Sequence, residues 1–162
     1  MDPVMVVVWA AVTLAVVAIY AGGWWVSKPM VVWGRFGFRL ALAALLAGLT
    51  LPAEAINAII AVLSVLMPNL GEVSDQPGAS FGMHFVLFAA VATGLLVFRH
   101  DAPQGVLVAA LLGLAVVSEL LQWPIPGRFA DGWDVVTNAY GVALGGLVRW
   151  VVVRAHLEPR IH

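Results

Sequence analysis

The chain has 162 residues, of which 62% are hydrophobic and only 10% are charged. Its mean hydropathy of +0.99 is far too high for one small water-soluble core, so the composition indicates an integral membrane protein. A formal net charge of −1 argues against nucleic acid as a partner, and the lack of cysteine excludes disulfides, thiolate nucleophiles and zinc–thiolate sites.

Five apolar stretches are long enough, or nearly long enough, to cross about 30 Å of hydrocarbon as helices. They are residues 4–20, 40–66, 81–98, 105–121 and 135–153. Because these stretches lack the period-2 alternation of barrel strands, we predict an all-α polytopic membrane bundle with about five transmembrane helices.

The first stretch has the apolar character of a signal peptide, but Asp2 stands where a basic start is usual, so we predict a helix that is retained. Residues 21–39 combine tryptophans and phenylalanines with Lys28, Arg35 and Arg39. This mixture is typical of a segment that lies along the inner membrane surface as an anchor. Residues 1–38 therefore form an extra transmembrane helix and an aromatic interfacial linker, ahead of a four-helix membrane domain in residues 39–162.

Basic residues gather on one side of the membrane if the five helices alternate in direction. Seven of the eight basic residues fall on that side, namely Lys28, Arg35, Arg39, Arg99, Arg149, Arg154 and Arg160. Positive charge favours the cytoplasmic side, so we expect the N-terminus outside and the C-terminus in the cytoplasm. Arg128, in the last outer loop, is the exception.

The second stretch, residues 40–66, is too long for an upright helix, so it must tilt, kink or break, and Pro52 is the predicted position of a kink. Glu54 and Asn57 would then be polar residues near the middle of the span, where an ionised carboxylate is costly. Two interpretations stay open. Glu54 either faces a polar cavity or a proton path, or it is a protonated carboxyl that hydrogen-bonds to a neighbouring helix or to backbone freed by Pro52.

Polar residues recur at the outer ends of the last three stretches. His84 lies one turn inside the third, and Glu119 and Gln122 end the fourth, just after Ser118. On the fifth, spacings of four, three and four residues place a polar and then small stripe on one helix face. Its members are Asp134, Asn138, Gly141 and Gly145. The two glycines form a small-x-x-x-small seam, which predicts close helix packing.

The topology places these polar groups at one depth, so we predict a shared site at the outer leaflet. Two interpretations stay open here as well. Arg128 held between Asp131 and Asp134 would pin the outer loop onto the bundle, a purely structural role. Alternatively, the excess of acids forms a pocket for a cation, an ammonium group or a proton. His, Glu and Asp together can hold a divalent metal, but the spacing demands none, so we predict neither a metal nor a specific cofactor.

At these residues the chain resembles the VanZ-like family of small bacterial membrane proteins, whose founding member is associated with resistance to the glycopeptide teicoplanin. The similarity lies in His84 followed by Phe85, in Glu119 and Gln122, and then in Arg128, Asp134, Asn138, Gly141 and Gly145 in order. It covers residues 39–150. The resemblance implies a multi-pass protein of the bacterial cytoplasmic membrane with a cell-envelope role. Family members often carry Asp-Lys four and three residues before the histidine and Tyr four after it, where this chain has Ser80, Phe81 and Phe88.

The favoured hypothesis is a VanZ-like protein whose outward-facing pocket binds or acts on a cell-envelope component, with membrane lipids and a lipid-linked or glycan ligand as candidate partners. Glu119 and His84 would handle protons or ligand, and Arg128 and Asp134 would orient the loop. Asn138 would donate hydrogen bonds, with Gln122 and Asp131 as further binding residues. A second hypothesis is a non-catalytic accessory subunit that meets a larger membrane complex through the glycine seam and its apolar faces. A third is a membrane hydrolase or transferase with Glu119 or Asp134 as base and His84 as acid, which requires mutual reach of about 3 Å, directly or through one water.

Overall fold

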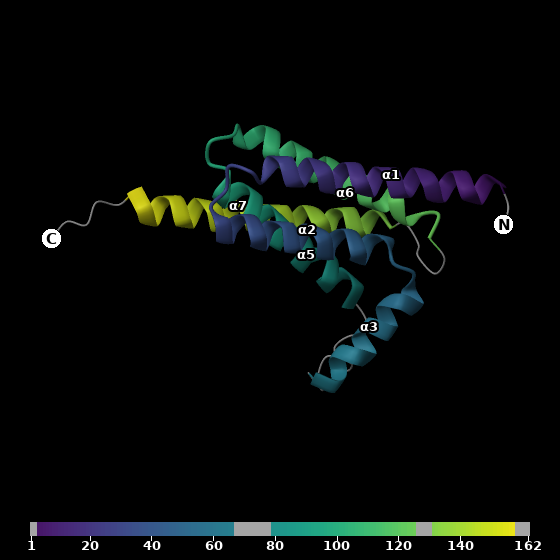
Figure 1. Ribbon diagram of the computed structural model, residues 1–162. Helices are drawn as coiled ribbons and strands as arrows, with labels where there is room; N and C mark the ends of the chain where they lie inside the picture. The colour runs from purple at the N-terminus through teal and green to yellow at the C-terminus, as the bar shows by residue number, and fades with distance from the viewer. Residues whose placement is uncertain (1–2, 67–78, 126–130, 158–162) are drawn as a thin grey trace.

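The computed structural model describes residues 3–66, 79–125 and 131–157, and within these ranges the chain forms six helices and no strand. The helices are α1 (Pro3–Val26), α2 (Val32–Thr50), α3 (Ala53–Leu66), α5 (Ala79–Phe98), α6 (Gln104–Gln122) and α7 (Gly132–Leu157). Five of them, all except α3, alternate in direction and lie alongside one another as an up-and-down bundle (Figure 1). The predicted all-α helical bundle is confirmed.

The bundle has the character of a multi-pass membrane protein. Four of its helices, α1, α2, α6 and α7, are long and apolar enough to cross a membrane, and α5 contributes a shorter apolar helix, Gly82–Phe98. Large apolar side chains are exposed on the outer faces of the bundle, for example Val7 and Leu14 on α1 and Leu120 on α6. Such a surface would aggregate in water but is the ordinary lipid-facing surface of a membrane bundle.

Helix α5 lies at the centre of the bundle and packs against α2, α6 and α7. Phe88, Val91 and Leu96 on α5 are at most 1% exposed, and they belong to one apolar cluster with Leu45 of α2. Helix α1 packs mainly against α2, and Val12 is its one buried residue among those described. The core is therefore formed by α2, α5, α6 and α7, and α1 lies at its edge.

Glycines allow α5 and α7 to approach each other closely. A Cβ atom placed on Gly141 would lie 2.7 Å from the carbonyl oxygen of Phe85, and one on Gly145 would lie 2.8 Å from the backbone nitrogen of Thr93. Real Cβ atoms do not approach backbone so closely, so only glycine fits at both positions. The glycine seam therefore faces the inside of this bundle, against α5.

The apolar stretch 40–66 is divided by a break at Pro52. Leu51 is extended, with φ −73° and ψ 137°, as expected for a residue before proline, and α2 ends at Thr50. Helix α3 then leaves the bundle at an angle (Figure 1). Glu54 and Asn57, which were expected near the middle of a continuous span, lie in the first turns of this separate helix, and both side chains are exposed.

Residues 21–39 also differ from the predicted interfacial linker. Residues 21–26 complete α1, a short turn follows, and residues 32–39 begin α2. The turn is stabilised locally, since the Ser27 hydroxyl donates to the carbonyl of Trp24 and accepts a hydrogen bond from Arg39 Nε at 2.8 Å. The guanidinium of Arg39 also stacks on the Trp24 ring at 3.4 Å. The aromatic and basic residues therefore form a tight connection between α1 and α2.

Candidate functional site

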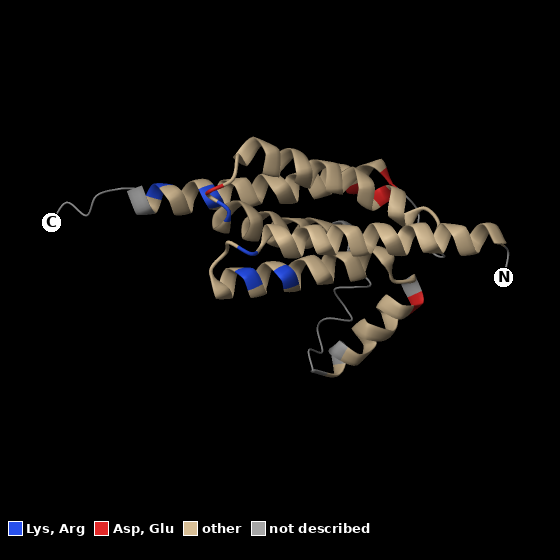
Figure 2. Cartoon of the chain, turned by 45° about the horizontal axis from the view of Figure 1, so that its top comes forward, with Lys and Arg blue, Asp and Glu red and all other residues tan. Residues whose placement is uncertain are grey.

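The polar site forms where α6 ends and α5 and α7 begin. Because neighbouring helices alternate in direction, the first turns of α5 and α7 reach the same end of the bundle as the last turn of α6. His84 comes from α5, Glu119 from α6 and Asp134 from α7. Figure 2 shows the acidic residues of α6 and α7 gathered at this end, opposite the blue basic residues of the bundle.

Three ionisable side chains meet within this site. His84, Glu119 and Asp134 are 6%, 6% and 7% exposed, and each offers one nitrogen or oxygen atom such that these atoms all lie within 4.8 Å of one another. The Nε2 atom of His84 is 3.9 Å from Oδ2 of Asp134, which is ion-pair distance but longer than a hydrogen bond. We name this group the His–Glu–Asp cluster.

Asp131 connects α6 to the start of α7. Its backbone N–H donates to Oε2 of Glu119 at 3.1 Å, and its own carboxylate accepts the N–H of Trp133 at 2.9 Å. Accepting a hydrogen bond from the second residue of the helix is the usual role of an aspartate at a helix N-cap. Asp131 itself is exposed, so it orients Glu119 through its backbone and lies outside the buried cluster.

A layer of neutral polar groups surrounds the cluster. Gln122 and Asn138 are 2% and 0% exposed, and Asn138 Nδ2 donates to the hydroxyl of Ser118 at 3.4 Å. Ser118 in turn donates to the carbonyl of Ala115 at 2.7 Å. Within the described ranges, Nε2 of Gln122 and Oδ1 of Asn138 have no hydrogen-bond partner. Buried polar atoms usually have a hydrogen-bond partner, so these two amide atoms can hydrogen-bond to a ligand or to water.

The residues that the sequence assigned to one site are largely brought together here. His84, Glu119, Gln122, Asp134 and Asn138 are buried at the same end of the bundle, and Asp131 lies at its edge. Arg128 lies outside the described residues, so its predicted pairing with the aspartates stays a prediction. Ser118 was grouped with its neighbours but given no role, although its position four residues before Gln122 places it on the same helix face.

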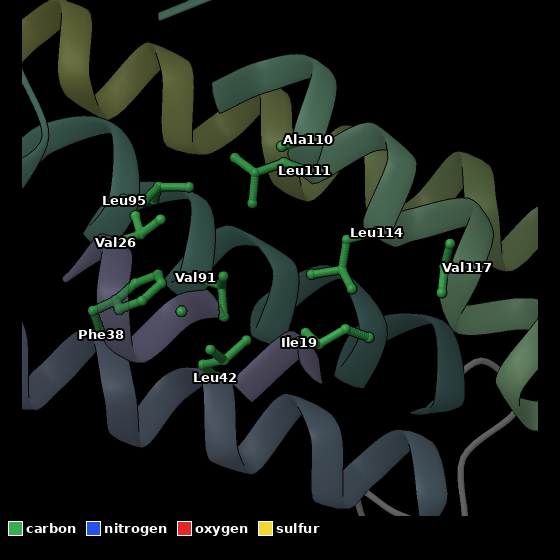
Figure 3. Close-up of a pocket in the computed structure, with 11 residues that line it drawn as sticks. Ile19, Val26, Phe38, Leu42, Val91, Leu95, Ala110, Leu111, Leu114 and Val117 are labelled. Carbon is green, nitrogen blue, oxygen red and sulfur yellow. The ribbon is translucent and has the colours of Figure 1, made fainter. Parts of the chain in front are cut away.

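The shape of the site differs from the expected open pocket. The polar side chains are packed between helices and are at most 7% exposed. The pocket drawn in Figure 3 is a different hollow, of about 310 Å³, lined by apolar residues of α1, α2, α5 and α6 such as Ile19, Phe38 and Leu111. Side chains this deeply buried are more accessible to a proton, a water molecule or a small ion than to a large ligand.

The distances within the cluster meet the requirement for acid–base chemistry. Two groups whose polar atoms lie within 4.8 Å of each other can be joined by one water molecule. The geometry is therefore compatible with proton transfer between an imidazole and a carboxylate. Comparison of the chain with protein-family models, with curated proteins and with solved structures gives no match. Function is therefore inferred from the residues themselves.

Proposed function

We propose that this chain is a VanZ-like integral membrane protein of the bacterial cytoplasmic membrane, and that its polar site binds or acts on a cell-envelope component. One observation carries the proposal: three helices bury a histidine, two carboxylates and two amides together at one end of the bundle. Intramembrane ionisable residues are costly, and their concentration in one place is typical of a functional site. Scattered structural polar residues would lie at both ends.

The sidedness of the charges supports a site that faces the envelope. The described basic residues of the bundle lie at the end opposite the His–Glu–Asp cluster (Figure 2). Positive charge next to a membrane span favours the cytoplasmic side. We therefore assign the basic end to the cytoplasm and the cluster to the extracytoplasmic side, with the N-terminus outside and the C-terminus inside. At that side, the exposed Asp131 and Trp133 would meet an envelope ligand before it reached the buried residues.

The accessory-subunit hypothesis invoked the glycine seam together with the apolar faces, and Gly141 and Gly145 are packed against α5. A partner protein would therefore bind to another surface. Purification in mild detergent separates the hypotheses. A stoichiometric protein partner would favour the subunit, whereas an isolated chain with bound lipid or glycan would favour the envelope function.

Complementation tests the proposed function directly. Deletion of the gene should change the susceptibility of the strain to teicoplanin or to other agents that act on the envelope. Expression of the wild-type protein should restore the original susceptibility. We expect His84→Gln, Glu119→Gln and Asp134→Asn to leave the strain at the deletion level, because each replaces a titratable group with a neutral amide of similar size. His100→Gln and Glu54→Gln are matched controls, since both side chains are exposed, and they should restore susceptibility.

Protein amounts in the membrane must be compared by immunoblot, so that loss of phenotype is read only for variants that accumulate normally. Full complementation by all three site variants would reject the site. A deletion strain with unchanged susceptibility to every envelope agent would reject the envelope role.

A further inference from the structure

The small size of the His–Glu–Asp cluster points to a specific occupant. We propose that His84, Glu119 and Asp134 together bind one divalent transition-metal ion of the Zn²⁺ type. The inference concerns the same site as the proposed function and rests on that function for the site's role, whereas the ion itself is inferred from the geometry. It goes beyond the sequence-based prediction, which named no metal.

The donor set favours a transition metal over the alkaline-earth ions. Mg²⁺ and Ca²⁺ prefer oxygen ligands, whereas an imidazole nitrogen together with carboxylates suits Zn²⁺ and its neighbours. Three protein ligands plus an open position for water is also the usual composition of a catalytic zinc site. His84, Glu119 and Asp134 provide one nitrogen and two carboxylates from three different helices. An ion bound here would join α5, α6 and α7.

The distances require only small side-chain movements. Ligand atoms around tetrahedral Zn²⁺ are about 3.3 Å apart, given metal–ligand bonds of about 2.0–2.1 Å. Nε2 of His84 is already 3.9 Å from Oδ2 of Asp134, and the third ligand atom lies within 4.8 Å of both residues' ligand atoms. Each side chain extends from a separate helix and has rotatable bonds, so the proposal requires side-chain rotation to bring the three atoms to coordination distance.

Charge also favours a cation. Two carboxylates that are buried side by side repel each other, and each loses hydration on leaving water. A dication between Glu119 and Asp134 offsets both costs, and a bound ion is often the largest local charge in such a site. The residues are at most 7% exposed, so the site accommodates an ion more readily than a large organic ligand.

The surrounding polar groups resemble the support that metal ligands normally have. The N–H of Asp131 fixes one oxygen of Glu119, which orients the carboxylate. Asn138 lies one turn after Asp134, and Gln122 lies three residues after Glu119, so each amide shares a helix face with one proposed ligand. Oδ1 of Asn138 and Nε2 of Gln122 have no partner in the described part of the chain, and both can hydrogen-bond to water on the ion.

Metal binding by the purified full-length chain tests the inference. After removal of any histidine tag and treatment with a chelator, ZnCl₂ is titrated into protein in detergent or lipid nanodiscs. We expect one Zn²⁺ per chain by elemental analysis and a rise in Tm of about 5 °C or more at saturation. MgCl₂ serves as the comparison ion and should leave Tm unchanged.

Matched variants locate the site. His84→Gln and Glu119→Gln should lose stoichiometric Zn²⁺, whereas His100→Gln and Glu54→Gln should bind like the wild type. CoCl₂ gives a measurement that depends on no variant, because four-coordinate Co²⁺ with nitrogen and oxygen ligands absorbs visible light much more strongly than hydrated Co²⁺ does. Failure of the wild type to bind Zn²⁺ and Co²⁺, or undiminished binding by both site variants, would overturn the inference.

The two proposals can fail separately. If Zn²⁺ binds but the site variants complement the deletion strain fully, the metal site stands and the envelope function is wrong. If the site variants lose the phenotype but the wild type binds no metal, the envelope function stands and the cluster works by proton transfer without an ion.

Discussion

Arginines at one end of the bundle hydrogen-bond to backbone carbonyls, whereas at the other end the ionisable side chains lie against one another. At the basic end, Arg99 donates to the carbonyl of Val26 and Arg149 donates to that of Leu96. Arg35 likewise donates to the carbonyl of Lys28. Carbonyls near the ends of α1 and α5 lack helical partners and carry negative partial charge, so arginine is a natural cap.

Asp101, the one carboxylate among the described residues at the basic end, interacts with a residue close to it in the sequence. Asp101 accepts a hydrogen bond from Arg99 at 2.7 Å in the connection between α5 and α6. This hydrogen bond holds the pKa of the exposed Asp101 carboxyl below its usual range. The pair is solvent-exposed on the aspartate side, so it adds little stability. Charge at this end therefore organises the loops and helix ends.

At the opposite end, the His–Glu–Asp cluster joins three helices through side chains that approach one another. Some of its polar capacity is unused, since Oδ1 of Asn138 has no hydrogen-bond partner in the described ranges. The contrast indicates how to separate architecture from function in this bundle. Polar groups that complete a helix end contribute to the fold, whereas buried polar groups that converge from several helices at a stability cost are the candidates for ligand binding.

The largest expected difference is that only one end of the bundle reacts with a reagent added outside the cell. The chain has no cysteine, so single cysteines can be introduced at Gly132 and at His100, both exposed. A membrane-impermeant maleimide on intact protoplasts should label Gly132→Cys completely, and His100→Cys only after permeabilisation. The reverse pattern would place the polar site on the cytoplasmic side and remove the envelope from the proposal.

A stability difference between arginines is expected next. Arg99→Ala removes the hydrogen bond to the Val26 carbonyl and leaves that partly buried acceptor without its donor, so the free energy of unfolding should fall by about 2 kcal/mol. Arg154→Ala is the control, because Arg154 is exposed and stacks on Trp150 at 4.9 Å, and it should cost less than about 0.5 kcal/mol. Equilibrium unfolding in mixed micelles with SDS measures both. Equal costs would contradict the structural role of the basic end.

At the polar end, a small change in stability is expected together with a loss of function. Asn138→Ala loses one long hydrogen bond but also removes a buried acceptor without a described partner, so the free energy of unfolding should change by less than about 1 kcal/mol. Leu45→Ala, at an equally buried apolar position, should cost roughly 2–5 kcal/mol in the same assay. Asn138→Ala should nevertheless fail to restore the original susceptibility of the deletion strain. A large loss of stability would assign Asn138 to the fold.

Much of the bundle follows from local sequence, because long apolar runs predict membrane helices directly. Residues 105–121 were expected in a helix and α6 is Gln104–Gln122. The structure differs most from the expectation at two places where local chemistry is ambiguous. A proline in an apolar run permits a kink or a break, and aromatic residues with arginines occur both on membrane surfaces and at helix ends. The hydrogen bonds of Arg39 to Ser27 and Trp24 decide the second case, because they hold α2 against the end of α1 and the turn that follows it.

The polar site was predictable in outline for a different reason. Alternating helices bring residues near corresponding ends to one depth, so His84, Glu119 and Asp134 could be assigned to one site without knowledge of their contacts. The closed packing of these side chains could not be foreseen, since it depends on how closely α5, α6 and α7 approach one another. Hydropathy does not report the distance between helices.

The glycine seam sets the distance between α5 and α7, and this distance also affects the geometry of the His–Glu–Asp cluster. Gly141 touches the backbone next to His84, and it lies on the same helix as Asp134. A methyl group at position 141 would push α7 away from α5. Gly141 therefore also sets the distance between the His84 imidazole and the Asp134 carboxylate, two turns away. A change at Gly141 would alter the space between these two side chains. Selection for a site that holds a proton, a water molecule or an ion of a given radius would therefore also act on this glycine, which has no polar side chain.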